Sequence, residues 1–192
     1  MNTYSTQNDL LLNNLLAFYN RDGNFQKMLS VVTGESAVSL RIVDWFATNF
    51  AKKYYTVYTI YDDAAGEKEQ QGSRFKVYND YKLKLKAYSK KRFDPFCRWD
   101  RINVPYKNGS SIQTTIGQLN FFKWVIENKV VEYIETHYDT IECDMNSRNS
   151  TSKKKEPIVS ENSKTRKKRE ELSISATKSI KREDIEIVLS FN

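Results

Sequence analysis

Residues 146–171 limit the fold that this chain can form. They read NSRNSTSKKKEPIVSENSKTRKKREE and contain almost no apolar side chain that a core can bury. Such a stretch cannot offset the entropy lost on ordering, so we expect a basic, disordered linker. One folded domain is therefore expected in residues 1–145, which would bury about two thirds of its unfolded surface. A C-terminal segment, 172–192, follows the linker.

The positive charge is gathered in two places. The chain carries 31 Lys and Arg against 24 Asp and Glu, a formal net charge of +7. Residues 146–183 hold twelve of the cations and five glutamates, which accounts for the whole excess. Within the balanced remainder, residues 76–101 hold nine cations and three acids. Clustered positive charge predicts a polyanionic partner, either nucleic acid or an acidic protein surface.

Residues 78–102 interleave cations with aromatic rings. The stretch reads YNDYKLKLKAYSKKRFDPFCRWDRI. Cationic groups neutralise phosphates and aromatic faces stack on bases, so this pattern is typical of a nucleic-acid-binding surface. Tyr88 and Trp99 are the candidate stacking residues. The candidate phosphate contacts are Lys82, Lys84, Lys86, Lys90, Lys91, Arg92, Arg98 and Arg101.

The same residues also fit an ordinary domain surface. Long cationic side chains can cover apolar surface while their charges stay in water. In this interpretation the aromatic rings are buried and the aspartates of the stretch pair with its arginines. The rings are Tyr81, Phe93, Phe96 and Trp99, and the pairs join Asp94 or Asp100 to Arg92, Arg98 or Arg101. The sequence leaves both interpretations open.

A second basic cluster lies in the linker. It consists of Lys153, Lys154, Lys155, Lys164, Arg166, Lys167, Lys168 and Arg169. The eight residues between its two halves give the spacing of a bipartite nuclear-import signal. Such a cluster also binds polyanions without sequence preference and with a strong dependence on salt. The same composition is typical of a solvated linker.

Periodic apolar residues predict a single, mostly helical α+β domain. Helices are expected at 7–20, 25–32, 36–53, 115–127 and 130–145. The β-branched and aromatic run at 54–61 and its return at 75–78 predict a small antiparallel β-hairpin against which the helices pack. A C-terminal strand is expected at 185–191, paired with this hairpin or with another molecule.

Residues 80–91 fit either a strand or a helix. Apolar and cationic residues alternate, which is a strand period, but four residues also repeat at helical spacing. These four are Tyr78, Tyr81, Leu85 and Tyr88. Asn79 as N-cap, Asp80 in the first turn and three cations before Asp94 favour the helix.

The clearest helix start is Thr115. Thr115 and Gln118 match a capping box, in which two side chains satisfy two free backbone amides reciprocally. A loop is expected before it, around Pro105 and Asn108-Gly109. The helix pair at 116–141 is expected to pack as two ordinary helices; a helix-turn-helix of a transcription accessory factor is the alternative.

The sequence carries no motif of a familiar enzyme. It has six glycines and no P-loop, GxGxxG or GxSxG pattern. Cys97 is expected to be a small buried residue, although its arginine neighbours also suit a reactive thiolate. Cys143 and the single His137 do not complete a zinc site with it. The acidic pairs at 142–144 and 184–186 are weak signals for Mg²⁺. We therefore predict no catalytic residue, no cofactor and no metal.

Membrane and export signals are also missing from the sequence. The opening MNTYSTQNDLLLNN is polar and has no basic region ahead of an apolar core. No apolar run approaches the roughly 18 to 20 residues that a membrane span requires. We expect a soluble protein of a reducing compartment.

Four blocks of the sequence carry a resemblance to a known family. They are SLRIVDWFATNFAKK (39–53), the whole of 78–102, TTIGQLNFFKWVIENKVVEYI (114–134) and RKKREELSISATKSIKREDIEIVLSF (166–191). Together they resemble a family of hypothetical proteins in nucleocytoplasmic large DNA viruses of algae and protists. The resemblance implies a viral core function, such as virion structure, genome packaging or late gene expression. It carries over no active site.

Two functions follow as expectations. The first is a non-catalytic protein that binds nucleic acid, DNA above all, without sequence preference. The alternative is a structural virion component or minor capsid protein that contacts acidic virion proteins. The expected location is the virion or the viral factory in the host cytoplasm, or the host nucleus through the 153–169 cluster. The sequence leaves the oligomeric state open.

Overall fold

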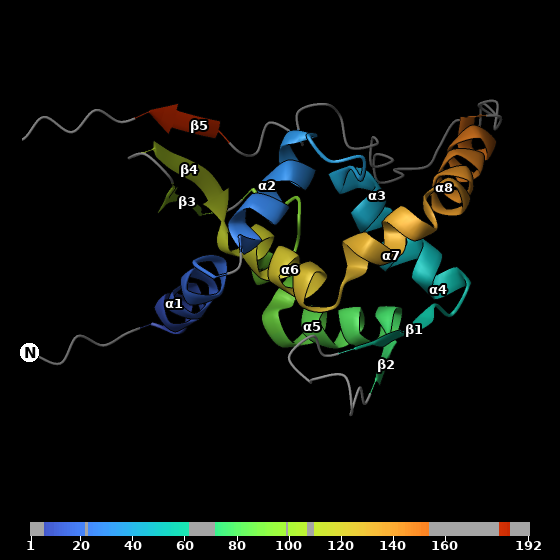
Figure 1. Cartoon of the computed structure of the whole chain (residues 1–192), viewed down its shortest axis with the longest axis horizontal. Helices are drawn as coiled ribbons and strands as arrows, with labels where there is room; N and C mark the ends of the chain where they lie inside the picture. Colours follow the sequence, from blue (N-terminus) through green and yellow to red (C-terminus); the bar gives the residue numbers. More distant parts are fainter. Residues whose placement is uncertain are drawn as a thin grey trace, which may run out of the picture.

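The chain folds as a single, mostly helical α+β domain, in which the described residues form two small antiparallel sheets (Figure 1). The structure is a computed structural model that describes residues 6–21, 23–61, 72–98, 100–106, 110–153 and 181–184. The helices are α1 (Gln7–Tyr19), α2 (Asn24–Thr33), α3 (Leu40–Trp45), the π-helical turn η1 (Phe46–Phe50), α4 (Ala51–Lys53), α5 (Val77–Arg92), α6 (Ile116–Glu127), α7 (Val130–Thr136) and α8 (Tyr138–Lys153). The strands are β1 (Val57–Ile60), β2 (Ser73–Lys76), β3 (Arg101–Pro105), β4 (Ser110–Thr115) and β5 (Lys181–Asp184).

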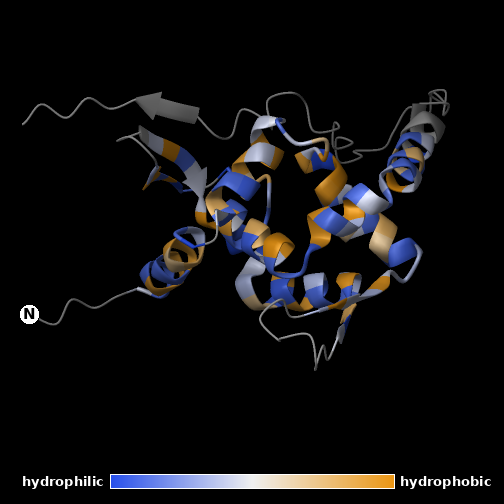
Figure 2. Ribbon diagram, in the orientation of Figure 1, coloured by the Kyte–Doolittle hydropathy of each residue, from blue (hydrophilic) through white to orange (hydrophobic). Residues whose placement is uncertain are grey.

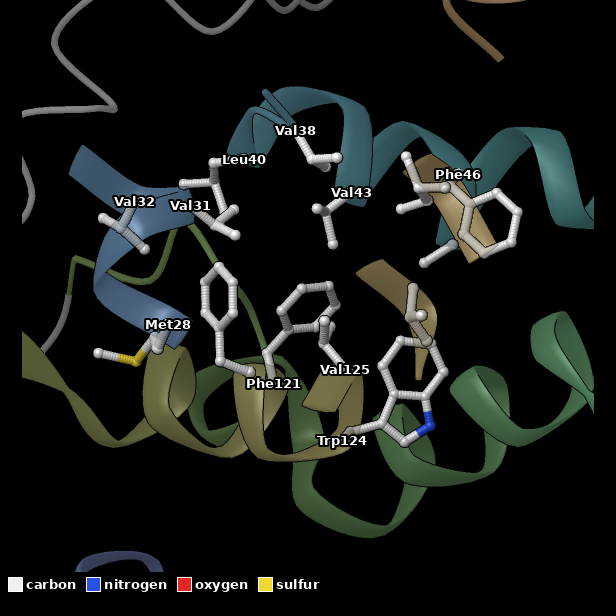
Figure 3. Packing of buried hydrophobic residues seen from close by; sticks show 14 of the residues in the cluster. Met28, Val31, Val32, Val38, Leu40, Val43, Phe46, Phe121, Trp124 and Val125 are labelled. Carbon is white, nitrogen blue, oxygen red and sulfur yellow. The ribbon is translucent and has the colours of Figure 1, made fainter. Parts of the chain in front are cut away.

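Helix α6 is the centre of the domain. Most of its side chains are buried, and the exception is a narrow outer strip that carries the Lys123–Glu127 ion pair. Phe121 and Val125 have no exposed surface, and Trp124 is 2% exposed. Figure 3 shows side chains of α2, α3 and η1 converging on these three residues. The predicted helix at 115–127 is confirmed.

Helices α3 and α4 are joined through the single π turn η1. Ser39 caps α3, because its hydroxyl accepts the Ile42 N–H at 3.4 Å. Within η1 the Ala51 N–H bonds to Phe46 O, five residues back. This wider turn lets both Phe46 and Phe50 point into the core, where their rings lie 5.9 Å apart. The apolar stripe predicted at 36–53 is thus kept across a change of helix type.

The predicted hairpin is confirmed. β1 and β2 pair antiparallel, with Tyr58 opposite Phe75. Tyr58 stacks on Tyr133 at 4.6 Å and donates its hydroxyl to Asn128 O at 2.7 Å, so the inner face of the hairpin lies against α6 and α7. The outer face, which includes Arg74 and Lys76, is exposed.

The second sheet replaces the loop expected around Pro105. β3 and β4 pair antiparallel, and Val104 lies opposite Ile112 in the core. Pro105 is the last residue of β3, where a missing N–H costs little. Asn108 and Gly109 lie outside the described residues.

Residues 181–184 of the C-terminal segment join this second sheet. β5 pairs antiparallel with β4, so β4 is the middle strand. β5 precedes the strand expected at 185–191, so its pairing does not test whether that strand meets the 54–78 hairpin or another molecule. The strand expected at 185–191 lies outside the described residues.

The helix expected at 130–145 is two helices. It breaks at His137 (φ −118°, ψ 22°), whose ring stacks on Tyr133 at 4.1 Å. The second part, α8, ends at Lys153, so the end expected near Met145 is wrong. Arg148 explains part of the extension, since its guanidinium lies 5.4 Å from the Trp45 ring and holds the extra turns against α3. Within the described residues, no helix is long and apolar enough to cross a membrane.

Candidate nucleic-acid interface

Residues 80–91 form a helix, as favoured. Helix α5 begins at Val77, directly after β2, because the Val77 N–H bonds to Thr56 O at 3.3 Å. Asn79 therefore lies inside the first turn and is not the N-cap, which is Lys76. Asp80 accepts a hydrogen bond from Trp124 Nε1 at 2.7 Å. This bond fixes the rotation of α5 on α6.

The inner side of α5 belongs to the core. Tyr81 lies 5.9 Å from the Trp124 ring, and burial raises its hydroxyl pKa to about 12. Tyr88, expected to stack on a base, is half-buried and stacks on Phe93 with ring centroids 6.3 Å apart. Phe93 is 1% exposed, in line with the domain-surface interpretation. One face of the Tyr88 ring is thus occupied within the domain.

The outer side of α5 presents cations. Lys82 and Lys86 are exposed one helical turn apart, beside Leu83, which is 65% exposed. Lys84 is half-buried on the flank. These three lysines form no ion pair with any residue that the structure describes. Figure 2 shows the mixture of hydrophilic and hydrophobic residues along α5.

A kink at Ser89 turns Lys90 and Lys91 away from the side of α5 that carries Lys82 and Lys86. Ser89 has φ 62° and ψ 163°, a conformation that favours glycine. Beyond it, Lys90 Nζ lies 3.7 Å from Asp94 Oδ2 and Lys91 Nζ lies 2.8 Å from Asp100 Oδ2. The aspartates pair with lysines rather than with the expected arginines. Both lysines are exposed, and such pairs contribute about 1 kcal/mol or less, so a phosphate can replace them.

The remaining members of the predicted set are dispersed. Arg92 is half-buried, whereas Arg98 is exposed. Arg101 lies on β3 and donates to Gln113 Oε1 at 2.8 Å. Trp99 lies outside the described residues. The structure therefore groups Lys82 and Lys86 and separates them from Arg101.

Cys97 is buried, as expected, at 5% exposure. Its Sγ donates to Lys91 O at 3.3 Å and faces Gly117. A Cβ at position 117 would lie 2.9 Å from Lys91 O, so glycine is required by the close approach of the two segments. The thiol is enclosed by the domain.

The expected capping box at Thr115 is half formed. The Thr115 hydroxyl accepts the Gln118 N–H at 3.1 Å. The Gln118 side chain does not return to the cap; it donates to Pro95 O at 3.1 Å and accepts from Thr114 Oγ1 at 2.9 Å. This buried amide ties the loop after α5 to the start of α6.

Sequence reasoning missed the cations at the end of α4. The ring of Tyr78 has Lys52 Nζ at 5.8 Å and Lys82 Nζ at 5.7 Å from its centroid. Lys52, Lys82 and Lys86 therefore form one surface across α4 and α5, which we call the basic surface. The signal in the sequence was the AKKYY run that precedes β1.

Asp144 binds α8 to the end of α4. Its carboxylate accepts hydrogen bonds from Trp45 Nε1 at 3.1 Å, Tyr54 Oη at 3.2 Å and Lys53 Nζ. Burial raises the pKa of this carboxyl, but the hydrogen bonds outweigh it and leave the pKa below its usual value. This carboxylate is part of the domain's hydrogen bonding. Among the described residues, no group of three metal-ligating side chains occurs.

The basic cluster of the linker is mostly beyond what the structure describes. Lys153 is the last residue of α8. Lys154, Lys155, Lys164, Arg166, Lys167, Lys168 and Arg169 lie outside the described residues.

Comparisons with known proteins agree with the resemblance seen in the sequence. The chain is 42% identical over 134 residues to an uncharacterised protein of Acanthamoeba polyphaga mimivirus. The match covers 67% of this chain and 49% of that relative, so the chain spans about half the length of the curated relative it matches. No solved structure matches. A family model covers residues 2–192, and the giant-virus relative agrees with it: the chain belongs to the family of unknown function DUF7197.

Proposed function

We propose that this chain is a non-catalytic protein that binds nucleic acid, DNA above all, without sequence preference. The observation that supports this is the basic surface, in which Lys52, Lys82 and Lys86 are exposed on adjoining helices. Each ammonium group that meets a phosphate releases a condensed counterion, which favours binding at low salt. A surface of lysines recognises the backbone and reads no base.

Two further cations extend the surface when a strand is present. The exposed side chains of Lys90 and Lys91 form ion pairs with Asp94 and Asp100. A phosphate can replace either carboxylate at little cost. The linker cluster would add a second contact that raises the local concentration of nucleic acid. This arrangement suits a protein of the virion or the viral factory, with entry into the nucleus through the 153–169 cluster.

The test is a titration of the full chain with fluorescent single-stranded DNA, duplex DNA and RNA at two salt concentrations. Lys82→Glu/Lys86→Glu reverses two charges on the basic surface. Arg21→Glu/Lys27→Glu makes the same change in net charge at two exposed positions in the α1–α2 region. The proposal expects the first variant to lose most of the affinity and the second to resemble the wild type.

A third variant measures the contribution of the linker cluster to binding, apart from that of the domain. It replaces Lys164 and the four cations at 166–169 with glutamine, and it is expected to weaken binding without abolishing it. If only this variant loses binding, the domain has another role. If the wild type binds no nucleic acid at low salt, the protein meets acidic virion proteins instead, as a structural component of the particle. Its association with virions would then survive nuclease treatment.

A further inference from the structure

We propose that a hollow between η1, α4 and α8 holds an unstacked base of a single-stranded nucleic acid, with Tyr55 as the stacking residue. The inference rests on the proposed function and adds to it the form of the ligand. It depends on residues that the sequence did not single out. The basic surface would bind the phosphates that follow the base.

Tyr55 stands in a place where a tyrosine is unfavourable. Helix α4 ends in a Schellman-type turn, because the Thr56 N–H bonds to Ala51 O at 3.1 Å. Tyr55 is the residue of this turn with left-handed backbone, at φ 48°. Glycine is the usual residue there, since a Cβ is strained in this region. The tyrosine side chain gains no burial in return, because it is 87% exposed.

Strained backbone at an exposed aromatic residue points to a role outside folding. Core packing cannot explain the side chain, and no ring partner of Tyr55 is found within the described part of the chain. Its neighbour Tyr54 differs: the Tyr54 ring lies 4.5 Å from Phe50 and its hydroxyl donates to Asp144. Tyr54 therefore stabilises the domain, whereas the Tyr55 side chain extends into solvent.

A hollow lies beside Tyr55. Its volume is about 380 Å³, within the range that small ligands occupy in proteins. It is lined by Thr48, Asn49, Lys52, Lys53, Tyr55 and Arg148. Three of these side chains are cations, two can form hydrogen bonds with a base, and none is a carboxylate.

The cations of the hollow are held in position by their neighbours. Arg148 Nη1 donates to Asn49 Oδ1 at 3.2 Å and its guanidinium packs on the Trp45 ring. Lys53 Nζ is bound by Asp144, whose side chain is only 7% exposed. Asp144 does not line the hollow, and it neutralises Lys53 in part, so Lys52 and Arg148 are the lining cations that would attract phosphate.

The hollow adjoins the basic surface. Lys52 lines the hollow and also packs on Tyr78, on which Lys82 packs as well. A strand whose base stacks on Tyr55 can therefore continue along α5. A duplex keeps its base faces covered, so an exposed tyrosine favours single strands.

The test compares the full-length wild type with Tyr55→Gly, using fluorescent oligodeoxythymidylate and a duplex of the same length. Glycine relieves the backbone strain, so the thermal midpoint is expected to rise by about 2 to 4 °C. The affinity for the single strand is expected to fall by about 5- to 150-fold, the effect of losing one base stack. The affinity for the duplex is expected to change little. Tyr55→Phe, which keeps the ring, should bind the single strand like the wild type.

Other outcomes overturn the inference, and they separate it from the proposed function. If Tyr55→Gly binds the single strand as tightly as the wild type while Lys82→Glu/Lys86→Glu does not bind, the hollow has no part and the basic surface stands. If the wild type binds neither ligand, both proposals fail. If Tyr55→Gly does not fold, Tyr55→Asn replaces it, since asparagine tolerates the left-handed conformation. Unchanged single-strand binding by that variant overturns the inference equally.

Discussion

Helices α5 and α6 lie side by side and use their residues in opposite ways. Most of α6 faces the core, whereas α5 presents one side to α6 and leaves Lys82, Leu83 and Lys86 exposed. Substitutions in α6 should therefore act on stability, and substitutions on the outer side of α5 should act on binding. A helix buried over most of its surface holds the domain together, and a helix buried on one side can contact a partner with the other.

The largest effect is expected from Phe121→Ala. This ring is fully buried and contacts Phe93 and Trp124, so its removal leaves a cavity. The free energy of unfolding should fall by about 3 to 5 kcal/mol. Denaturant unfolding measures it. A loss below about 1 kcal/mol would mean that α6 is not the centre of the core.

Asp144→Asn should have the next largest effect, about 1.5 to 3 kcal/mol of stability, because three donors lose their charged acceptor. The pKa of Asp144 is lowered in the folded protein, so its contribution is complete above pH 4 or so. It is lost as the pH falls through the lowered pKa. Thermal unfolding across this acidic range should show a smaller loss for the variant than for the wild type. Parallel curves would show that Asp144 does not hold α8.

Ser89→Gly tests the kink between the two parts of α5. Glycine adopts φ 62° without strain, so we expect a gain of up to about 1 kcal/mol in the free energy of unfolding. Ser89→Ala, which keeps the Cβ, is the matched control and should give no such gain. Equal effects of the two substitutions would place the strain elsewhere.

Lys52→Gln should have the smallest effect on binding. Lys52 lies where α4 meets α5, the two helices that carry the basic surface. Loss of one phosphate contact is expected to weaken DNA binding about threefold at moderate salt. Stability should stay within about 0.5 kcal/mol of the wild type, since the side chain is exposed. Lys27→Gln on α2 is the control for charge. An equal loss of affinity in both variants would point to net charge rather than to a surface.

Much of the fold could be predicted because apolar periodicity reports burial. The stripes of α1, α2, α5 and α6 and the alternation of the first hairpin all lead to the right elements. The break at His137 could not be seen, since apolar spacing continues across it. The second hairpin was hidden by Pro105, which suits the end of a strand as well as a loop.

The candidate site was predicted less completely. Lys82 and Lys86 follow from the helical period, but the partners of Lys90, Lys91 and Tyr88 depend on how the chain turns after Ser89. The left-handed backbone at Tyr55 could not be predicted from the sequence, because glycine usually occupies such a position and here a tyrosine does. Lys52 could not be assigned to the basic surface from the sequence, because it meets Lys82 only where α4 packs on α5 and both lysines lie over the Tyr78 ring.

The most direct test of the account is the salt dependence of DNA binding by the full chain and by Lys82→Glu/Lys86→Glu. The logarithm of the binding constant falls linearly with the logarithm of the salt concentration, with a slope set by the number of phosphate contacts. The account predicts a slope reduced by roughly 2 in the variant, with unfolding unchanged. An identical slope in the variant and the wild type would show that the outer side of α5 does not contact nucleic acid.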